Sequence, residues 1–170
     1  MALIKAVRGN SPRFGKNCFL AENATVVGEV IMGDNCTVWF NAVIRGDVNS
    51  ITIGNNTNIQ DGAVIHGTYE RSKTVIGNNV SIAHNAVVHG CTLHDNVLIG
   101  MGAIVMDNAV VESNSVIAAG AVVLAGTHVE GGSVYGGMPA KKLKPISDEL
   151  KAAITRTAAN YPMYAEWFKE

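Results

Sequence analysis

The sequence predicts an all-β protein, a single-stranded parallel β-helix of hexapeptide repeats followed by a C-terminal α-helix. Three observations carry this prediction. Large apolar residues recur every six positions over most of the chain, Gly, Val, Ile and Asn are abundant, and residues 147–170 have helical spacing. We therefore divide the chain into a β-helix domain at 1–146, with repeats at about 14–140, and a helix at 147–170 packed on it.

The apolar period of six is interrupted at three places, after Ile44, Ile65 and Val88. The repeated residues are Phe14, Leu20, Val26, Met32, Val38, Ile44, Ile53, Ile59, Ile65, Ile76, Ile82, Val88, Leu93, Ile99, Val105, Val111, Ile117, Val123, Val129 and Tyr135. A small or β-branched residue usually follows four positions later, as Ala24 follows Leu20. An ordinary antiparallel sheet would instead alternate with a period of two.

A six-residue period predicts triangular coils, with three faces of six residues in each coil. The large residue of each face points inward, and the small residue fits the corner. One coil cannot bury its inner face alone, so stacked coils make the core. The stacking also aligns residues of successive coils in columns, and this register can be used to locate functional side chains.

The repeat ends near GGMPAKKLKP at residues 136–145, where Gly and Pro indicate a turn. Ser147 then offers a helix N-cap, and apolar residues follow at Leu150, Ile154 and Ala158. We expect this helix to pack along the outside of the β-helix. Pro162 should kink or break it.

Composition excludes several function classes. Thirteen Lys and Arg against fourteen Asp and Glu give a net charge of -1, so no basic field for nucleic acid or an anionic membrane is expected. No apolar run approaches the roughly 20 residues of a membrane span, and no secretory signal is expected at the N-terminus. Three well-separated cysteines favour reduced thiols, and hence a cytoplasmic protein.

Histidines are the main chemical signal, and the register brings two of them together. Arg45, His66 and His89 each follow the apolar residue of one face, on three successive coils. Adjacent coils lie about 4.8 Å apart and Zn–N bonds are about 2.1 Å, so His66 and His89 can share one ion.

His84 lies on the preceding face, about 12 Å or more along the chain from His89 at strand rise. It can join the same ion only from a symmetry-related subunit, which predicts a homotrimer with metal sites at its interfaces. Three histidines and a water form a catalytic zinc site. The column of Trp39, Gln60 and Ala83 on the His84 face should bring Gln60 into the site. The alternative is that all the histidines are ordinary surface residues, as we expect for His94 and His128.

Several motifs of this sequence resemble the γ-class carbonic anhydrases and their bacterial relatives. They are AVIRGD (42–47), NIQD (58–61), His66 six residues after Gln60, IAHNAVVHG (82–90), GGMPAKK (136–142) and AANY (158–161). The resemblance covers essentially the whole chain. It implies a left-handed β-helix, an exception to the right-handed crossovers of most parallel strands.

The resemblance also implies residue roles and a reaction. The implied metal ligands are His66, His84 and His89, and the other implied site residues are Gln60, which orients the metal-bound hydroxide, Arg45 and Asp47, which form an ion pair, and Asn58 and Tyr161, which line the pocket. Metal-bound hydroxide would attack CO2 and release bicarbonate. The loop after His66 is only GTYERSKT, with Glu70 as its one acid, and we hypothesise that Glu70 or buffer accepts the proton.

Two other readings remain open. Hexapeptide β-helix proteins include acyltransferases that use acetyl-CoA, and relatives are linked to thioester hydrolysis. A metal-stabilised trimer without turnover is the third reading. Three metal-spaced histidines in place of one general base favour the lyase. Zinc suits such a site, and iron, cobalt and nickel suit it as well.

Overall fold

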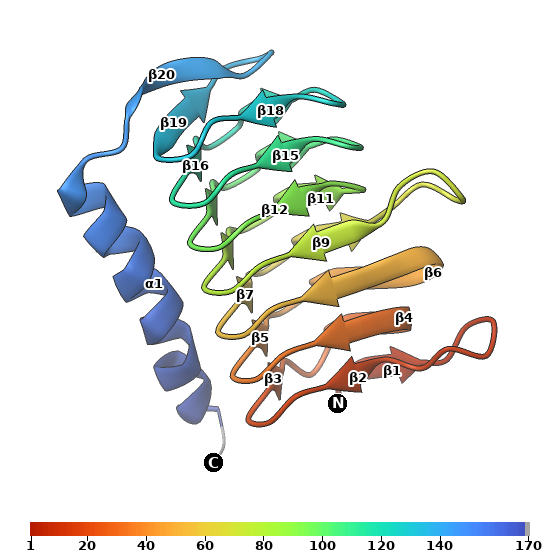
Figure 1. The fold of residues 1–170 in the computed structure, drawn as a ribbon. Helices are drawn as coiled ribbons and strands as arrows, with labels where there is room; N and C mark the ends of the chain where they lie inside the picture. The colour runs from red at the N-terminus through yellow and green to blue at the C-terminus, as the bar shows by residue number, and fades with distance from the viewer. Residues whose placement is uncertain (169–170) are drawn as a thin grey trace.

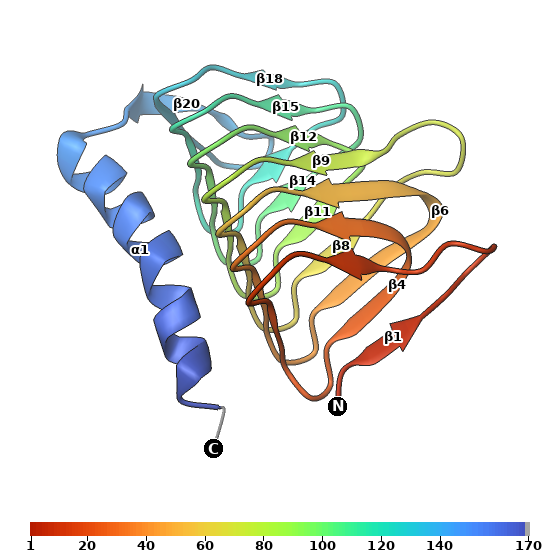
Figure 2. The same cartoon turned by 60° about the horizontal axis from the view of Figure 1, so that its bottom comes forward.

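In the computed structural model, which describes residues 1–168, the chain winds into a triangular parallel β-helix (Figures 1 and 2). Helix α1 (Asp148–Glu166) runs along one side of it. The predicted fold class is confirmed. No helix in the described part of the chain is long and apolar enough to cross a membrane.

Three faces make up the prism, and two of them share one sheet because strands β4 and β6 bend around their common corner. The first face contains β1 (Leu3–Lys5), the first halves of β4 (Thr25–Met32) and β6 (Val43–Ile53), β8 (Val64–His66), β11 (Val87–His89), β14 (Ile104–Val105) and β17 (Val122–Val123). The second contains β2 (Arg13–Phe14), the second halves of β4 and β6, β9 (Thr74–Ile76), β12 (Thr92–Leu93), β15 (Val110–Val111) and β18 (His128–Val129).

The third face is the second sheet. It contains β3 (Phe19–Leu20), β5 (Thr37–Val38), β7 (Asn58–Ile59), β10 (Ser81–Ile82), β13 (Leu98–Ile99), β16 (Val116–Ile117), β19 (Ser133–Gly136) and β20 (Lys141–Pro145). Helix α1 contacts β5 and β10 of this face. The other two faces keep their outward side chains for solvent or for other molecules.

The core consists of the repeated apolar residues, which are buried from Val26 through Tyr135. Phe14 and Leu20 are only half-buried because they lie in the first coil, which has no full neighbour below it. Small corner residues such as Ala24, Ala42 and Ala63 are fully buried. Each therefore leaves room for the turn between two faces, as the repeat predicts.

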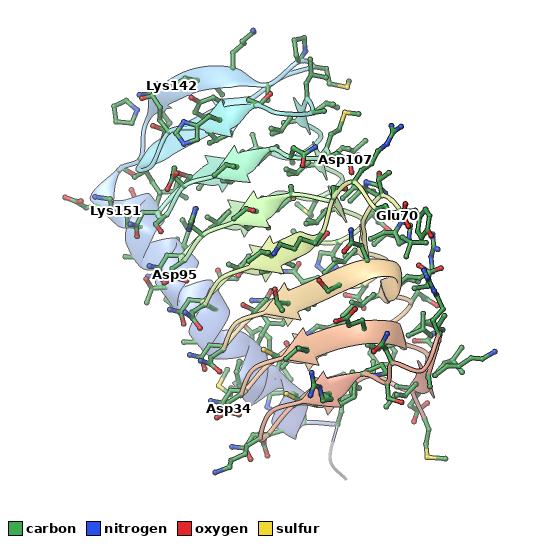
Figure 3. All side chains as sticks on the ribbon, turned by 45° about the vertical axis from the view of Figure 1, so that its right-hand side comes forward. Asp34, Glu70, Asp95, Asp107, Lys142 and Lys151 are labelled. Atoms are coloured by element: carbon green, nitrogen blue, oxygen red, sulfur yellow. The ribbon has the colours of Figure 1, made fainter. Side chains whose placement is uncertain are left out.

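Asparagines stabilise one corner of successive coils. Asn35, Asn56, Asn79 and Asn96 have φ between 54° and 57°, the left-handed region that Asn tolerates better than most residues. Their amides form a ladder, in which each donates to the next at 3.2–3.3 Å. Acidic side chains such as Asp34 and Asp95 lie along the same edge of the molecule (Figure 3).

Two elements at the ends were not predicted. Strand β1 pairs with β4, and β20 returns antiparallel to β19 after a turn containing the cis Met138–Pro139 bond. The sequence signal for β20 was hidden because all five of its residues are exposed and three are lysines. Lysines on an outer strand discourage further strand pairing, which suits the last strand of the sheet.

Helix α1 begins as predicted and continues through Pro162. The Ser147 side chain accepts a hydrogen bond from the Leu150 backbone N–H at 3.2 Å, which confirms the N-cap. Of the two effects expected of Pro162, a kink or a break, the break does not occur, because the helix continues to Glu166. Burial of Ala158 and Ala165 on either side of Pro162 offsets the missing backbone hydrogen bond. Residues 169 and 170 of the predicted helix lie outside the described residues.

Candidate metal centre

The register predicted from the sequence is the register of the structure. Strands β6, β8 and β11 pair through Ile44, Ile65 and Val88, and His89 pairs directly with His66. The ring nitrogens His66 Nδ1 and His89 Nε2 lie 3.2 Å apart. Arg45 lies one coil below, with Nη2 3.4 Å from His66 Nδ1. Strand stacking alone therefore brings two imidazoles and a guanidinium to one spot on the first face.

Asp47 holds the ring of His66. Its Oδ1 lies 3.0 Å from His66 Nε2, and its Oδ2 accepts a hydrogen bond from Arg45 Nη1 at 2.6 Å. Burial would raise the pKa of the Asp47 carboxyl, but hydrogen bonds from Arg45 and His66 outweigh burial and hold that pKa below its ordinary value. Burial lowers the pKa of His66, and the Arg45 charge adds to that effect. A neutral His66 that donates from Nε2–H to Asp47 keeps its lone pair on Nδ1, the nitrogen that faces His89.

Asp107 has the same relation to His89. Its Oδ2 lies 3.1 Å from His89 Nδ1, while its Oδ1 accepts hydrogen bonds from the hydroxyls of Thr68 and Ser72. Burial would raise the pKa of Asp107, but the bonds from Ser72, Thr68 and His89 hold it below its ordinary value. A carboxylate on Nδ1 directs the lone pair of His89 Nε2 toward His66.

His84 is held apart from the other two. It lies in the corner after β10, and its Nδ1 is 2.9 Å from Asp61 Oδ2. Its side chain is 44% exposed, with Nε2 free of that contact. Within residues 1–168 of one chain, no three His, Cys, Asp or Glu side chains converge on a common point where an ion could sit. One chain therefore supplies two of the predicted ligands at one place and the third at another.

Gln60 and Asn58 form a buried polar chain beside β7 and β10. Gln60 Nε2 donates to Asn58 Oδ1 at 3.0 Å, and Asn58 Nδ2 donates to Ser81 Oγ at 2.8 Å. Both residues are almost completely buried. Gln60 lies one coil above Trp39 in the outward column of the third face. The Trp39 ring packs edge-on against the Tyr161 ring, with 5.5 Å between the ring centroids.

Helix α1 therefore brings Tyr161 to the wall of this region. Burial raises the pKa of Tyr161 to about 12, and the nearby Asp61 charge adds to it. The phenol therefore stays protonated at neutral pH.

The donor set fits a metal ion of the zinc type. Each of the three histidines has a carboxylate on one ring nitrogen, Asp47, Asp61 or Asp107, at 2.9–3.1 Å. Metal-binding histidines are usually oriented in this way by an outer carboxylate. When each ring donates to its carboxylate, the facing nitrogens of His66 and His89 are both acceptors, and two acceptors 3.2 Å apart suit a shared cation. His94 and His128 differ, because both share one carboxylate, that of Glu112 on the second face.

The carboxylates Asp61 and Asp107 were missed in the sequence, although the register contains the signal. Asp61 and His84 are both the second residue after a core isoleucine on successive coils, Ile59 and Ile82. Asp107 is likewise stacked beside Gly90, next to His89. Reading the column next to the histidines would have found both.

Comparison with known proteins identifies the family of this chain. The family model described as bacterial transferase hexapeptide (six repeats) matches residues 11–46, 73–105 and 90–125. The γ carbonic anhydrase 1, mitochondrial, of Arabidopsis thaliana is 42% identical over 161 residues, covering 92% of this chain and 58% of that protein. This is a γ-carbonic-anhydrase-like protein of the hexapeptide-repeat family.

Solved structures agree with this γ-carbonic-anhydrase-like fold. A hexapeptide transferase family protein from Anaplasma phagocytophilum is 38% identical, with a TM-score of 0.93 and 98% of each chain covered. A Bacillus cereus protein named provisionally as an acetyltransferase is 29% identical, with a TM-score of 0.95, and covers 99% of this chain and 97% of its own. The present γ-carbonic-anhydrase-like chain spans little more than half the length of the plant relatives, 58% and 56%.

Proposed function

We propose that this protein is a metal-dependent lyase of the γ-carbonic anhydrase type, which hydrates CO2 reversibly to bicarbonate at sites shared between copies of the chain. One observation carries the proposal. His66 Nδ1 and His89 Nε2 lie 3.2 Å apart, and each ring has a carboxylate on its other nitrogen. The plant relative named γ carbonic anhydrase supports the reaction class.

An outward column of aliphatic residues supports association through the histidine face. Alternate residues of that face form the column Val43, Val64, Val87, Ile104 and Val122. Val64 is 36% and Ile104 37% exposed. The equivalent column of the second face is mixed, because Arg13, Thr52, Thr92 and His128 stand in it beside Ile31, Val75 and Val110. A continuous apolar surface of this kind favours contact with another protein surface.

We propose a closed homotrimer, because a triangular prism can place one histidine face against the His84 corner of the next copy around a threefold axis. His66 and His89 of one chain and His84 of its neighbour would then hold the ion. Zinc is the first candidate, with iron, cobalt or nickel as alternatives for the same nitrogen ligands. The three cysteines are free thiols, which supports a cytoplasmic location.

A zinc ion held by these residues would lower the pKa of a bound water to about 7 and so would supply a hydroxide nucleophile at neutral pH. The residues of the chain provide position and environment. The ion pair of Arg45 and Asp47 fixes the ring of His66. Asn58 fixes the amide of Gln60, which can then orient the nucleophile by a hydrogen bond. Tyr161 packs edge-on against Trp39, the neighbour of Gln60 in its column, and would line the pocket.

Acyl transfer from acetyl-CoA, or thioester hydrolysis, is the second candidate function. The transferase descriptions of the two solved relatives favour it. A general-base transferase would need no metal, so dependence on metal separates the two candidates. A metal-stabilised assembly without turnover would bind metal and act on neither substrate.

The test is stopped-flow CO2 hydration by protein of measured metal content, loaded with zinc and, separately, with iron. Release of free thiol from acetyl-CoA is followed in parallel. We expect hydration that falls by at least 10²-fold in His66→Ala, while His94→Ala, a surface control, keeps it. Thiol release without hydration in metal-free protein would replace the lyase with the acyl-CoA function.

A further inference from the structure

Asp107 joins two parts of the protein that are distant in sequence. It lies after β14, one coil above His89, and Figure 3 shows it toward the same edge of the molecule as Glu70. Its Oδ2 holds His89 Nδ1 at 3.1 Å. Its Oδ1 accepts hydrogen bonds from Thr68, at 2.9 Å, and from Ser72. One carboxylate thus contacts a predicted metal ligand and both ends of the loop between β8 and β9.

At the tip of that loop, residues 67–73, the Arg8 guanidinium lies 5.5 Å from the centre of the Tyr69 ring. Thr68 N–H donates to Ser72 Oγ at 3.0 Å, which closes the base of the loop. Tyr69 and Glu70 at the tip are exposed, and Glu70 has φ of 54°. Ser72 itself is only 4% exposed. The hydroxyl pair on Asp107 therefore anchors the base of the loop to the β-helix by hydrogen bonds, while Arg8 lies over the Tyr69 ring at the tip.

The packing around Gly90 shows that this anchor has a specific space. Gly90 has φ of 57°, and a Cβ there would lie 2.0 Å from Ser72 Oγ and 2.3 Å from Asp107 Oδ1. Any larger residue would displace Ser72 and the carboxylate together. Thr74, just after the loop, contacts the backbone next to both predicted metal ligands. Its Oγ1 donates to the carbonyl of His66 and accepts from the N–H of Gly90, the residue after His89, at 3.0 Å.

We propose that Asp107 is a positioning residue that couples the order of loop 67–73 to the orientation of His89. With Asp107 in place, His89 Nδ1 donates to a carboxylate and Nε2 is left as the acceptor that faces His66. Release of the loop frees Asp107 to move, and the His89 ring then loses its fixed direction. Ion binding at His89 must favour the ordered loop by the same factor, since coupling between two sites is reciprocal. The metal part of this inference rests on the proposed function, and the loop part does not.

The experiment compares three variants with the wild type. Asp107→Ala removes the carboxylate, and the double variant Thr68→Val with Ser72→Ala releases the loop without touching an atom that contacts His89. Glu112→Gln is the matched control, a carboxylate 3.0 Å from His128 with no loop attached. The readouts are zinc affinity by chelator competition, trypsin cleavage after Arg71, and the His89 tautomer by nitrogen NMR of metal-free protein.

We expect Asp107→Ala to weaken zinc binding about 10–100-fold, the usual effect of losing an outer ligand. The double variant should weaken it several-fold, both should speed cleavage after Arg71, and the control should do neither. Zinc should protect Arg71 in the wild type and not in Asp107→Ala. Unchanged zinc affinity in both variants, or unchanged cleavage, would overturn the coupling.

The failure of the proposed function would look different. Wild-type protein that binds no zinc would count against the metal site, and the tautomer and cleavage readouts would then decide the role of Asp107 alone. The wild type should hold His89 with its proton on Nδ1, and Asp107→Ala should shift it to a mixture. A tautomer that is the same in both would refute the positioning role. The double variant keeps the test usable if Asp107→Ala does not fold.

Discussion

Complementation between two inactive variants tests the proposed sharing of the site most directly. His66 and His89 lie 3.2 Å apart on one chain, whereas His84 is held elsewhere by Asp61. A His66→Ala chain therefore lacks a ligand on its first face, and a His84→Ala chain lacks one at its corner. Each pure variant should form assemblies in which every site is broken.

The size of the recovery follows from the geometry of the ring. A site is whole when a His84→Ala chain supplies the intact histidine face and a His66→Ala chain supplies the intact corner. In a closed ring assembled at random from equal amounts, each partner of an interface has the right identity half of the time, so about a quarter of sites are whole. After chelation and reloading, we expect about a quarter of the wild-type zinc content and of any hydration rate.

The control mixture is His66→Ala with His89→Ala. These two ligands come from the same chain, so no interface in that mixture is ever whole and no recovery is expected. Subunit exchange is verified by co-purification of two affinity tags. Recovery in both mixtures alike, or in neither despite proven exchange, would refute the division of ligands between copies.

Three further predictions concern single residues. Asn56→Ala should lower the free energy of unfolding by about 2–4 kcal/mol in chemical denaturation. The variant loses two amide hydrogen bonds of roughly 0.5–1.5 kcal/mol each, and Ala tolerates positive φ less well than Asn. Asn56→Gly should lower the free energy of unfolding less, and an equal loss in both variants would contradict the contribution of backbone strain. Glu70→Gln should slow hydration in dilute buffer and recover in concentrated imidazole, and a rate indifferent to both would exclude Glu70 as the proton acceptor. The pKa of Tyr161, raised from 10.0 to about 12, means that the folded state keeps a proton which the unfolded state loses, so stability should decline between pH 10 and 12 in the wild type and decline less in Tyr161→Phe.

The period of six was sufficient to predict the stacking of His66 on His89, because a parallel β-helix has little freedom of register once its inward residues are known. The same reasoning extended to Gln60 above Trp39. Strands β1 and β20 were not predicted from the sequence because they lie at the ends of the β-helix. Each pairs with a single neighbouring strand there and carries no inward apolar repeat. The course of α1 through Pro162 depended on tertiary burial, which outweighs a local propensity.

The side-chain environment of the site was harder to predict than its register. A column shows which residues lie side by side, but whether Asp107 turns to His89 or to solvent depends on rotamers and on the loop from another coil. The contribution of His84 stays a prediction, since a sequence of one chain contains the ligand but not the arrangement of its copies.

The alternation of side chains on the histidine face links assembly to chemistry. Because strand residues alternate in direction, the two outward positions around each core residue form separate columns. On this face one column is the aliphatic series from Val43 to Val122, and the other contains Arg45, His66 and His89. A neighbouring copy that buries the first column is necessarily brought to the second. Zinc binding and association of copies should therefore stabilise each other by mass action, so a site of this design loses its metal on dilution as well as on chelation.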